Sequence, residues 1–340
     1  MRAARSFDRN RRTFLARTGA MGATALLGEH ANAAAAEPPP EIRKLRLLHV
    51  PAICHVPQYL AEDLLHLEGI TEVEYVPFGT RYIPAALAES KADMSMCNAM
   101  ELIPYMDANK PVVALAGIHS GCFEVFASGR VQSVRDLKGK TVAITYPGGG
   151  DHILLSSMLA YVGIDQREVN WMPGTTSLLD AMDAFSQGKA DAFVGFAQQP
   201  AEMRARKVGH VIVNTTTDRP WSQYYCCMLG ANREFTQRYP VTTKRALRAI
   251  LKAADICAAQ PLQVARFLSD KLYETRYAIG REVVESLPYN RWREANPEDT
   301  IRCYALRLHE VGMVKNTPQK LTAQGTDWRF LNELKRELKT

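Results

Sequence analysis

One internal repeat constrains the fold of this chain more than any other feature. Residues 45–70 and 141–164 follow the same order: an apolar β-rich run, a loop with a proline, a helical pattern and a closing glycine–isoleucine pair. Each copy continues into a second apolar run, a turn with glycine and threonine, a short helical pattern and a lysine–alanine–aspartate junction, at 91–93 and 189–191. The features recur in one order at a nearly constant offset, so we interpret them as a duplication.

Each copy predicts strand, helix, strand, helix, strand, which is the pattern of a mostly parallel sheet covered by helices. Two copies therefore predict two α/β lobes. The chain from residue 232 onward has helical apolar spacing, clearest in 239–259, and contains no third copy, so we expect it to pack on one lobe. Residues 112–128 and 221–231 have the composition of strands, and they would carry the chain out to the second lobe and back.

The first 36 residues predict a twin-arginine signal peptide. Arg11 and Arg12 precede a weakly apolar run to Leu27, and small residues follow around Ala31 and Ala33. The run is too short to span a bilayer, so we expect a periplasmic protein without stable membrane insertion. Removing the signal lowers the formal charge from +6 to +2, because six arginines and two acids leave with it. No basic cluster recurs downstream, so we expect no nucleic-acid partner.

Ligands of open parallel sheets bind beyond the carboxyl ends of the strands. Applied to both copies, this rule selects six loops, at 52–55, 78–81, 96–98, 146–152, 174–177 and 196–198. Two lobes joined by two strands can close on a ligand by hinge motion. The candidate ligand-binding residues in or near these loops are Cys54, His55, Gly79, Thr80, Arg81, Cys97, Asn98, His119, Gly149, Gly150, Asp151, His152, Thr175 and Phe196.

The glycine-rich turn at 148–150 does not have the spacing of a nucleotide-binding loop. Its glycines still allow a close backbone approach, and the helix that follows offers unpaired amide donors. Asp151 can contact a ligand or cap this helix. Its charge disfavours an anion, while Arg81 and nearby histidines could neutralise a carboxylate, so we expect a zwitterionic or neutral small molecule. Candidates for aromatic stacking are Phe78, Phe196, Trp221 and Tyr224.

Cysteines and histidines are frequent near these loops. The seven cysteines are odd in number and form no CxxC pair, so no disulfide framework follows from them. Soft side chains converging on one cleft could bind a transition metal. They are Cys54, His55, Met96, Cys97, His119, Cys122, His152, Cys226 and Cys227. Metal-ligand spacings are lacking, so we expect no metal or cofactor, but an organic ligand held by hydrogen bonds. A Cys97–His119 nucleophile pair lacks an orienting acid, so we expect no enzyme.

Three features carry a family resemblance: the HVPQYLAED segment after the first strand, the two lysine–alanine–aspartate junctions and the glycine-rich turn. With them the chain resembles the type II periplasmic substrate-binding proteins of ABC importers, in the NMT1/THI5-like family that binds nitrate, taurine, alkanesulfonates and thiamine precursors. The motifs cover residues 45–229. The resemblance implies a two-lobed α/β fold with the helical C-terminal region on lobe one. Its boundaries would be 42–123 plus 226–340 for lobe one and 124–225 for lobe two, with hinge strands near 119–126 and 222–229.

The resemblance also implies partners and leaves two alternatives open. A monomer would deliver a small-molecule ligand to an ABC permease and its ATPase. One alternative is an enzyme of the same fold, because thiamine-pyrimidine synthases of this family carry a CCCFC segment and an active-site histidine. In place of that segment this chain has only the cysteine pair Cys226 and Cys227, in the predicted strand at 221–231. The other alternative is a periplasmic protein that binds or delivers a metal.

Overall fold

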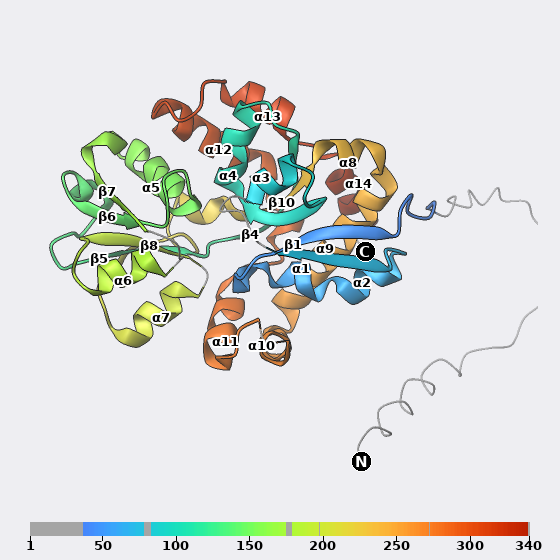
Figure 1. Ribbon diagram of the computed structural model, residues 1–340, viewed down its shortest axis with the longest axis horizontal. Coiled ribbons are helices and arrows are strands. Elements are labelled where there is room, and N and C mark those ends of the chain that lie inside the picture. Colours follow the sequence, from blue (N-terminus) through green and yellow to red (C-terminus); the bar gives the residue numbers. More distant parts are fainter. Residues whose placement is uncertain (1–36, 78–82, 175–178, 197, 272, 339–340) are drawn as a thin grey trace, which may run out of the picture. The chain divides into compact units, whose positions relative to one another are not determined.

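The structure is a computed structural model that describes residues 37–77, 83–174, 179–196, 198–271 and 273–338 (Figure 1). The chain divides into two compact units, Met1–Pro38 and Pro39–Thr340. The predicted signal peptide lies outside the described residues, and every helix and strand described below belongs to the second unit.

Two five-stranded sheets organise the described part of the second unit. The first sheet has the order β2-β1-β3-β10-β4. Its strands are β1 (Lys44–His49), β2 (Glu72–Pro77), β3 (Met94–Asn98), β4 (Val112–Ser120) and β10 (Tyr225–Asn232). The second sheet has the order β7-β6-β8-β5-β9. Its strands are β5 (Phe123–Ala127), β6 (Thr141–Ile144), β7 (Asn170–Pro173), β8 (Ala192–Phe196) and β9 (His210–Asn214).

The two sheets have the same topology, as the internal repeat predicts. In each sheet the first strand of the repeat, β1 or β6, lies parallel between the second and third. The fourth strand, β10 or β5, is antiparallel to both of its neighbours. The chain passes from β4 to β5 and from β9 to β10, so two connections join the sheets. The predicted fold class, two mostly parallel sheets flanked by helices, is confirmed.

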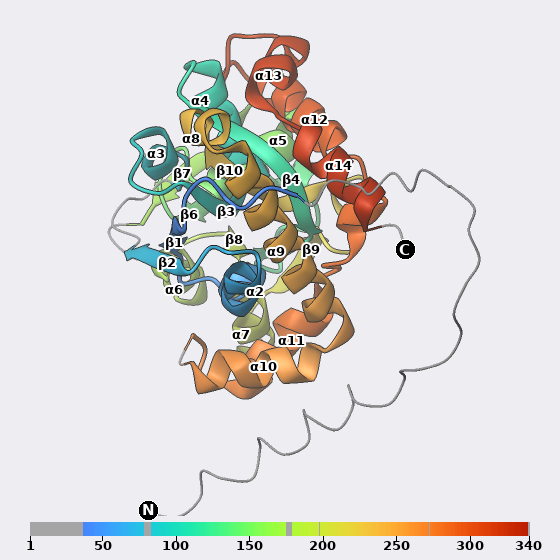
Figure 2. The ribbon, with the colours of Figure 1, turned by 90° about the vertical axis from the view of Figure 1, so that its right-hand side faces the viewer.

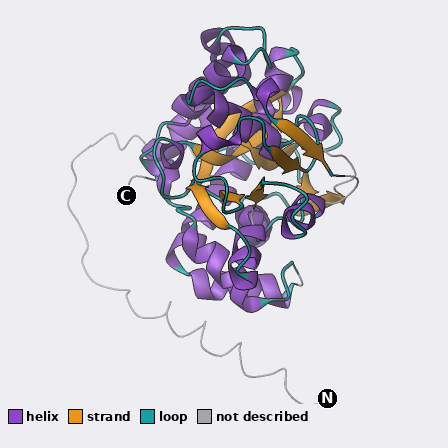
Figure 3. Cartoon of the chain, turned by 90° about the vertical axis from the view of Figure 1, so that its left-hand side faces the viewer, coloured by secondary structure: helices purple, strands orange, loops and turns teal. Residues whose placement is uncertain are grey.

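Helices cover both faces of each sheet (Figures 1 and 3). Those of the first repeat are α1 (Val56–Leu60), α2 (Glu62–Leu67), α3 (Ile83–Ala88) and α4 (Ala99–Asp107). Those of the second are α5 (Gly150–Tyr161), α6 (Asp180–Ser186) and α7 (Gln199–Arg206). Figure 1 shows α3 and α4 on one face of the first sheet and α1 and α2 on the other, while α5 lies opposite α6 and α7. None of the helices in the described ranges is long and apolar enough to span a bilayer.

The C-terminal region is helical, as predicted. Its helices are α8 (Arg233–Arg238), α9 (Pro240–Ala259), α10 (Pro261–Asp270), α11 (Tyr277–Ser286), α12 (Pro297–Glu310), α13 (Pro318–Gly325) and α14 (Arg329–Glu337). Helix α9 contacts α1, α2 and α14, and α12 and α13 contact α4 (Figure 2). In addition α12 contacts α5 and α11 contacts α7. The region therefore packs on the first sheet and also contacts helices of the second.

The aspartates of the two lysine–alanine–aspartate junctions have the same structural role in both repeats. The backbone N–H of Arg46 in β1 donates to Oδ2 of Asp93 at 2.7 Å, and that of Thr141 in β6 donates to Oδ2 of Asp191 at 3.1 Å. The N–H of each aspartate donates in turn to the carbonyl of the same strand residue. Each aspartate thus ties the start of the third strand to the first strand, beyond the ordinary ladder of the sheet.

The close packing of β10 against β4 requires a glycine at position 117. A β-carbon on Gly117 in β4 would lie 2.3 Å from Cδ2 of the Tyr225 ring, far inside contact distance. Tyr225 is 2% exposed, and its hydroxyl donates to the carbonyl of Arg291 in a short 3-10 helix, η5 (Arg291–Arg293). Glycine at this position lets the ring lie flat against β4, next to the connection to the second sheet.

Candidate functional site

The start of α4, directly after β3, meets the start of α5 through a side chain and a backbone amide. Strand β3 ends at Asn98, which is the N-cap residue of α4, and Glu101 lies in the first turn of that helix. The Glu101 carboxyl accepts hydrogen bonds from the Asn98 side chain and from the backbone N–H of Gly150, the first residue of α5. A β-carbon on Gly150 would lie 2.6 Å from Nδ2 of Asn98 and 2.9 Å from Oε1 of Glu101. The two repeats are therefore in direct contact at their strand ends.

Burial dominates the chemistry of Glu101. The residue is 6% exposed, and burial raises the pKa of its carboxyl to about 8. Hydrogen bonds from Asn98 and Gly150 act in the opposite direction, and the charge of Asp151 raises the pKa further. At neutral pH this carboxyl is mostly protonated, so it can both donate and accept a hydrogen bond.

Asp151 does not cap its helix in the predicted manner. Gly149 is the N-cap residue of α5, and Asp151 lies within the first turn. Its Oδ2 accepts the backbone N–H of Thr145 at 2.5 Å, and its Oδ1 accepts the backbone N–H of His152 at 2.8 Å. The carboxylate thus joins the end of β6 to the start of α5. Burial raises its pKa.

His152 stabilises the same turn. Its Nδ1 accepts the backbone N–H of Gly148 at 3.0 Å, and its ring lies edge-on to Trp171 with centroids 4.6 Å apart. Burial lowers the pKa of His152 to about 4, so the imidazole is neutral at physiological pH. The neutral ring accepts from Gly148 and so connects the start of α5 to the glycine-rich turn.

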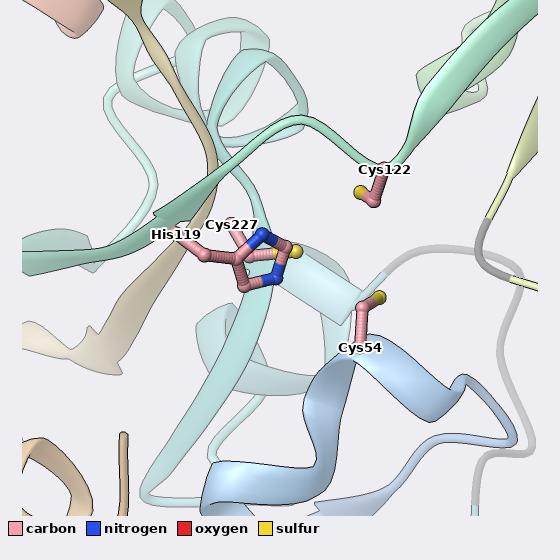
Figure 4. A group of neighbouring side chains, drawn as sticks. All are labelled: Cys54, His119, Cys122 and Cys227. Carbon is pink, nitrogen blue, oxygen red and sulfur yellow. The ribbon is translucent and has the colours of Figure 1, made fainter. Parts of the chain in front are cut away.

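A thiol–imidazole cluster lies at the connection between the sheets. It consists of Cys54, His119, Cys122 and Cys227, whose potential ligand atoms all lie within 4.8 Å of one another (Figure 4). The four residues come from three separate segments: Cys54 from η1 (Ile53–His55) after β1, His119 and Cys122 from β4 and its connection to β5, and Cys227 from β10. All seven cysteines of the chain are free thiols in the structure.

More polar side chains surround this cluster. Sγ of Cys227 lies 3.8 Å from Nε2 of His55, 3.9 Å from Sγ of Cys226 and 3.8 Å from Oδ1 of Asn98. Asn98 therefore contacts the cluster through its carbonyl oxygen and Glu101 through its amide group. The contact between the repeats and the thiol–imidazole cluster form one continuous buried polar region.

The local backbone explains how the cluster forms. Gly121 and Cys122 both have left-handed conformations, with φ of 85° and 76°. This conformation is ordinary for glycine but unfavourable for cysteine. The double turn directs Sγ of Cys122 toward His119 and Cys227, as Figure 4 shows. A side chain that is held in place by a strained backbone is a candidate for a functional role.

Burial and mutual contact divide the thiols by their pKa. Burial raises the pKa of Cys54, Cys122 and Cys226 well above the ordinary value. Burial acts in the same direction on Cys227, but the neighbouring thiols of Cys122, Cys226 and Cys54 and the ring of His119 together hold its pKa well below the usual range. Cys227 is therefore the thiol of the cluster that loses its proton first.

The structure places the other predicted site residues in several environments. Cys97 contacts the carbonyl of Met228 and would lie 3.1 Å from a β-carbon on Gly230, among side chains of α3 and α4, so its thiol points away from the cluster. Phe196 packs against Phe123 with ring centroids 4.8 Å apart. Gly79, Thr80, Arg81 and Thr175, and the stacking candidate Phe78, lie outside the described residues.

Glu101 is a candidate site residue that the sequence analysis missed. Asn98 followed three residues later by Glu101 has the spacing of a capping box, which would predict only a local role at the start of a helix. Asn98 is the N-cap residue, but its side chain makes no capping hydrogen bond, and Glu101 instead accepts from Gly150. The local signal predicted the helix start and gave no information about the distant partner.

Comparisons with solved structures give the class of the fold. The alkanesulfonate-binding protein SsuA from Xanthomonas axonopodis pv. citri, bound to MOPS, is 16% identical over 85% of this chain and 99% of its own, with a TM-score of 0.69. The periplasmic nitrate-binding protein NrtA from Synechocystis PCC 6803 is 14% identical over 88% and 89%, with a TM-score of 0.70. The ligand-binding component of an ABC-type import system from Staphylococcus aureus, with zinc bound, is 12% identical over 85% and 98%, with a TM-score of 0.68.

The fold is thus that of the type II periplasmic substrate-binding proteins. The model of the family described as NMT1/THI5 like matches residues 55–264, and the chain belongs to this family. No curated protein matches the chain.

Proposed function

We propose that this chain is the exported solute-binding subunit of an ABC importer. It captures a small organic molecule between the strand ends of its two repeats and delivers it to a permease and its ATPase. The proposal includes removal of a twin-arginine signal and a periplasmic location. The lobes would be residues 42–123 with 226–340, and residues 124–225, which turn about the connections near 119–126 and 222–229.

The contact of Glu101 and Asn98 with Gly150 carries this proposal. It joins the carboxyl end of β3 to the start of α5, the positions where open α/β sheets bind ligands. Only two chain connections join the sheets, so this contact can open when the lobes separate. A solute that contacts both sides would stabilise the closed arrangement through its differential affinity for the two states.

The acidic groups at this contact favour a particular solute chemistry. Glu101 and Asp151 are both buried beside the first turn of α5, and burial raises the pKa of each carboxyl. The charge of Asp151 disfavours a simple anion, although SsuA and NrtA are named for alkanesulfonates and nitrate, while the neutral Glu101 can accept a hydrogen bond from a solute. We propose a neutral or zwitterionic solute that presents a hydrogen-bond donor to these groups.

The geometry favours binding over catalysis. The suggested nucleophile pair, Cys97 with His119, is not assembled, because Cys97 points into the helices α3 and α4. Burial also raises the pKa of the Cys97 thiol well above its ordinary value, which disfavours the reactive thiolate. The structural relatives described above are named as binding proteins, in line with a role without catalysis.

The proposal is tested by capturing the solute and then blocking closure. The purified protein is incubated with a small-molecule extract of its host, and retained molecules are released by denaturation and identified by mass spectrometry. Calorimetry then measures the affinity of the identified solute for the wild type and for Gly150→Ala. The added methyl group would collide with Asn98 and Glu101, so we expect an affinity loss of about tenfold or more.

Gly129→Ala is the matched control, because a β-carbon there meets no atom within 4 Å. We expect this variant to bind like the wild type. Alanine at the first position of α5 does not weaken the helix itself, so lost binding in Gly150→Ala reports on closure. Wild-type affinity in Gly150→Ala, or no retained molecule at all, would contradict the proposal.

A further inference from the structure

We propose that Cys54, His119, Cys122 and Cys227 form a binding site for one thiophilic d¹⁰ metal ion, Zn²⁺ or Cu⁺. This site goes beyond the proposed capture of an organic solute, and it neither requires that function nor is required by it. The four side chains offer three sulfurs and one ring nitrogen, and the potential ligand atoms all lie within 4.8 Å of one another. Sulfur and imidazole donors in this number are the set that such ions prefer in proteins.

The His119 ring is oriented as a ligand. Its Nδ1 lies 3.2 Å from the carbonyl oxygen of Ser120, an acceptor that places the ring proton on Nδ1. Nε2 then carries a lone pair, and it has no hydrogen-bond partner among the residues that the structure describes. His119 is 0% exposed, so this lone pair is also shielded from water. A histidine whose second nitrogen is fixed by a backbone carbonyl is the usual arrangement at a metal site.

The backbone supports the same assignment independently. Cys122 has a φ of 76°, which costs free energy in a residue with a side chain, and this conformation directs its thiol into the cluster. The Tyr289 ring packs edge-on to His119 at 5.1 Å between centroids, which limits rotation of the imidazole. The ligands are thus positioned before any ion binds, so binding would cost little ordering of the chain.

The surroundings fit a soft ion better than a hard one. Carboxylates and several waters are the ligands of Mg²⁺ and Ca²⁺, and the four residues of the cluster include no carboxylate. Metal binding would release the thiol protons and form metal–thiolate bonds without any change of oxidation state. His55 and Cys226 lie just outside the four ligands, against Cys227, where they can support that residue.

The first experiment titrates the metal-free, reduced full chain with Zn²⁺ and, without oxygen, with Cu⁺ against chromophoric competitors. We expect one ion per chain. Cys54→Ser and Cys227→Ser should each weaken binding by about 100-fold or more, because each removes a ligand. Cys257→Ser is the matched control, since this cysteine is equally buried in α9 but lies outside the cluster. It should bind like the wild type.

A second measurement examines the wild type itself, before any substitution. X-ray absorption of the Zn²⁺-loaded wild type should show three sulfurs at about 2.3 Å and one nitrogen at about 2.0 Å. His119→Gln should weaken Zn²⁺ by about tenfold or more, and should affect Cu⁺ less, because three thiolates already satisfy Cu⁺. The tighter of the two ions in competition identifies the metal.

Three results would overturn the site: no ion retained by the reduced wild type, fewer than three sulfurs around Zn²⁺, or unchanged affinity in both serine variants. A disulfide within the cluster that forms in the purified protein, with no metal bound after reduction, would also contradict it and would identify a redox pair instead. None of these results would affect capture of an organic solute at Gly150, which is measured separately by mass spectrometry and calorimetry.

Discussion

Glu101 in α4 accepts a hydrogen bond from the backbone N–H of Gly150, the first residue of α5. The two residues belong to different repeats, so this bond links the two sheets at their strand ends. The first amides of a helix attract a negative charge, yet the carboxyl held here is mostly neutral near pH 7 because burial raises its pKa to about 8. The contact therefore depends on pH.

The free energy of unfolding should decrease as the pH rises toward 8, and ionisation of Glu101 should cause part of this decrease. The folded pKa of about 8 lies above the ordinary value of 4.5, so the folded state holds a proton that the unfolded state releases. The stabilisation is complete below pH 4.5. It decreases between pH 4.5 and pH 8, and it is lost as the pH rises through 8. The slope of the free energy of unfolding approaches about 1.4 kcal/mol per pH unit within this window.

Urea unfolding between pH 5 and pH 9 measures this dependence in the wild type and in Glu101→Gln. The glutamine variant should lose the part of the slope that Glu101 causes. Asp151 faces Glu101 and also has a raised pKa, and Cys227 lies nearby, so some dependence will remain. Identical pH profiles for the two proteins would contradict the assignment.

The aspartates of the two junctions should stabilise the two sheets unequally. Asp93 accepts the N–H of Arg46 and also pairs with its guanidinium at 2.6 Å, whereas Asp191 pairs with the more exposed Arg130 at 2.9 Å. Asp93→Ala should cost about 2–3 kcal/mol and Asp191→Ala about 1–2 kcal/mol of unfolding free energy. Denaturant unfolding compares them, and a larger cost for Asp191→Ala would contradict the structural ranking.

Gly117→Ala should destabilise the connection between the sheets. The added methyl group would lie 2.3 Å from the ring of Tyr225, which is buried and hydrogen-bonded to the carbonyl of Arg291, so the strands or the ring must shift. We expect a cost of about 1–3 kcal/mol, as for other overpacked sites. Thermal unfolding measures it beside Gly129→Ala, which should be nearly neutral. A neutral Gly117→Ala would show that the strands separate here more easily than the packing indicates.

Arg204 should stabilise the contact between the second sheet and the C-terminal helices. It pairs with Glu124 of β5 at 2.5 Å and with Glu282 of α11 at 2.6 Å. Burial raises the pKa of Glu124, and Arg204 opposes that effect. Arg204→Ala leaves Glu124 buried with less compensation, so we expect a cost of about 1–3 kcal/mol at neutral pH.

Adding Glu124→Gln to that variant should recover part of the loss, because the buried charge is then removed as well. Arg281→Ala is the control, since its exposed pair with Glu285 should contribute about 0.3–0.5 kcal/mol. Equal costs for Arg204→Ala and Arg281→Ala in urea unfolding would show that the bridge to α11 adds nothing.

The sheets were predictable because their signals are local and occur twice. The glycine after each first helix and the aspartate of each junction, Asp93 and Asp191, stand at fixed places in each copy, and they mark the limits of the elements. The strands that cross between the lobes were predicted from the composition of residues 112–128 and 221–231. The N-cap of α5 was harder, because both Gly149 and Asp151 are favourable residues at such a position, and in the structure the Asp151 carboxylate accepts from Thr145, before the helix, and from His152.

The thiol–imidazole cluster could not be predicted from spacing. Its members are distributed over three segments, so no short motif contains them, and each was a single cysteine or histidine near a strand end. Strand alternation alone separates Cys97 from Asn98, because successive side chains of β3 point to opposite faces. The left-handed conformation of Cys122, which completes the cluster, has no signal in the sequence beyond the preceding Gly121.

The order of strands in the two sheets determines when each can be completed during synthesis. The second sheet uses only residues from Phe123 to Asn214, one continuous stretch of chain. The first sheet needs β10, which ends at Asn232 and lies between β3 and β4. Strands β3 and β4 thus leave the ribosome early but have no shared neighbour until the entire second sheet has followed. The first repeat is the first to be made, and its sheet is the last to be completed.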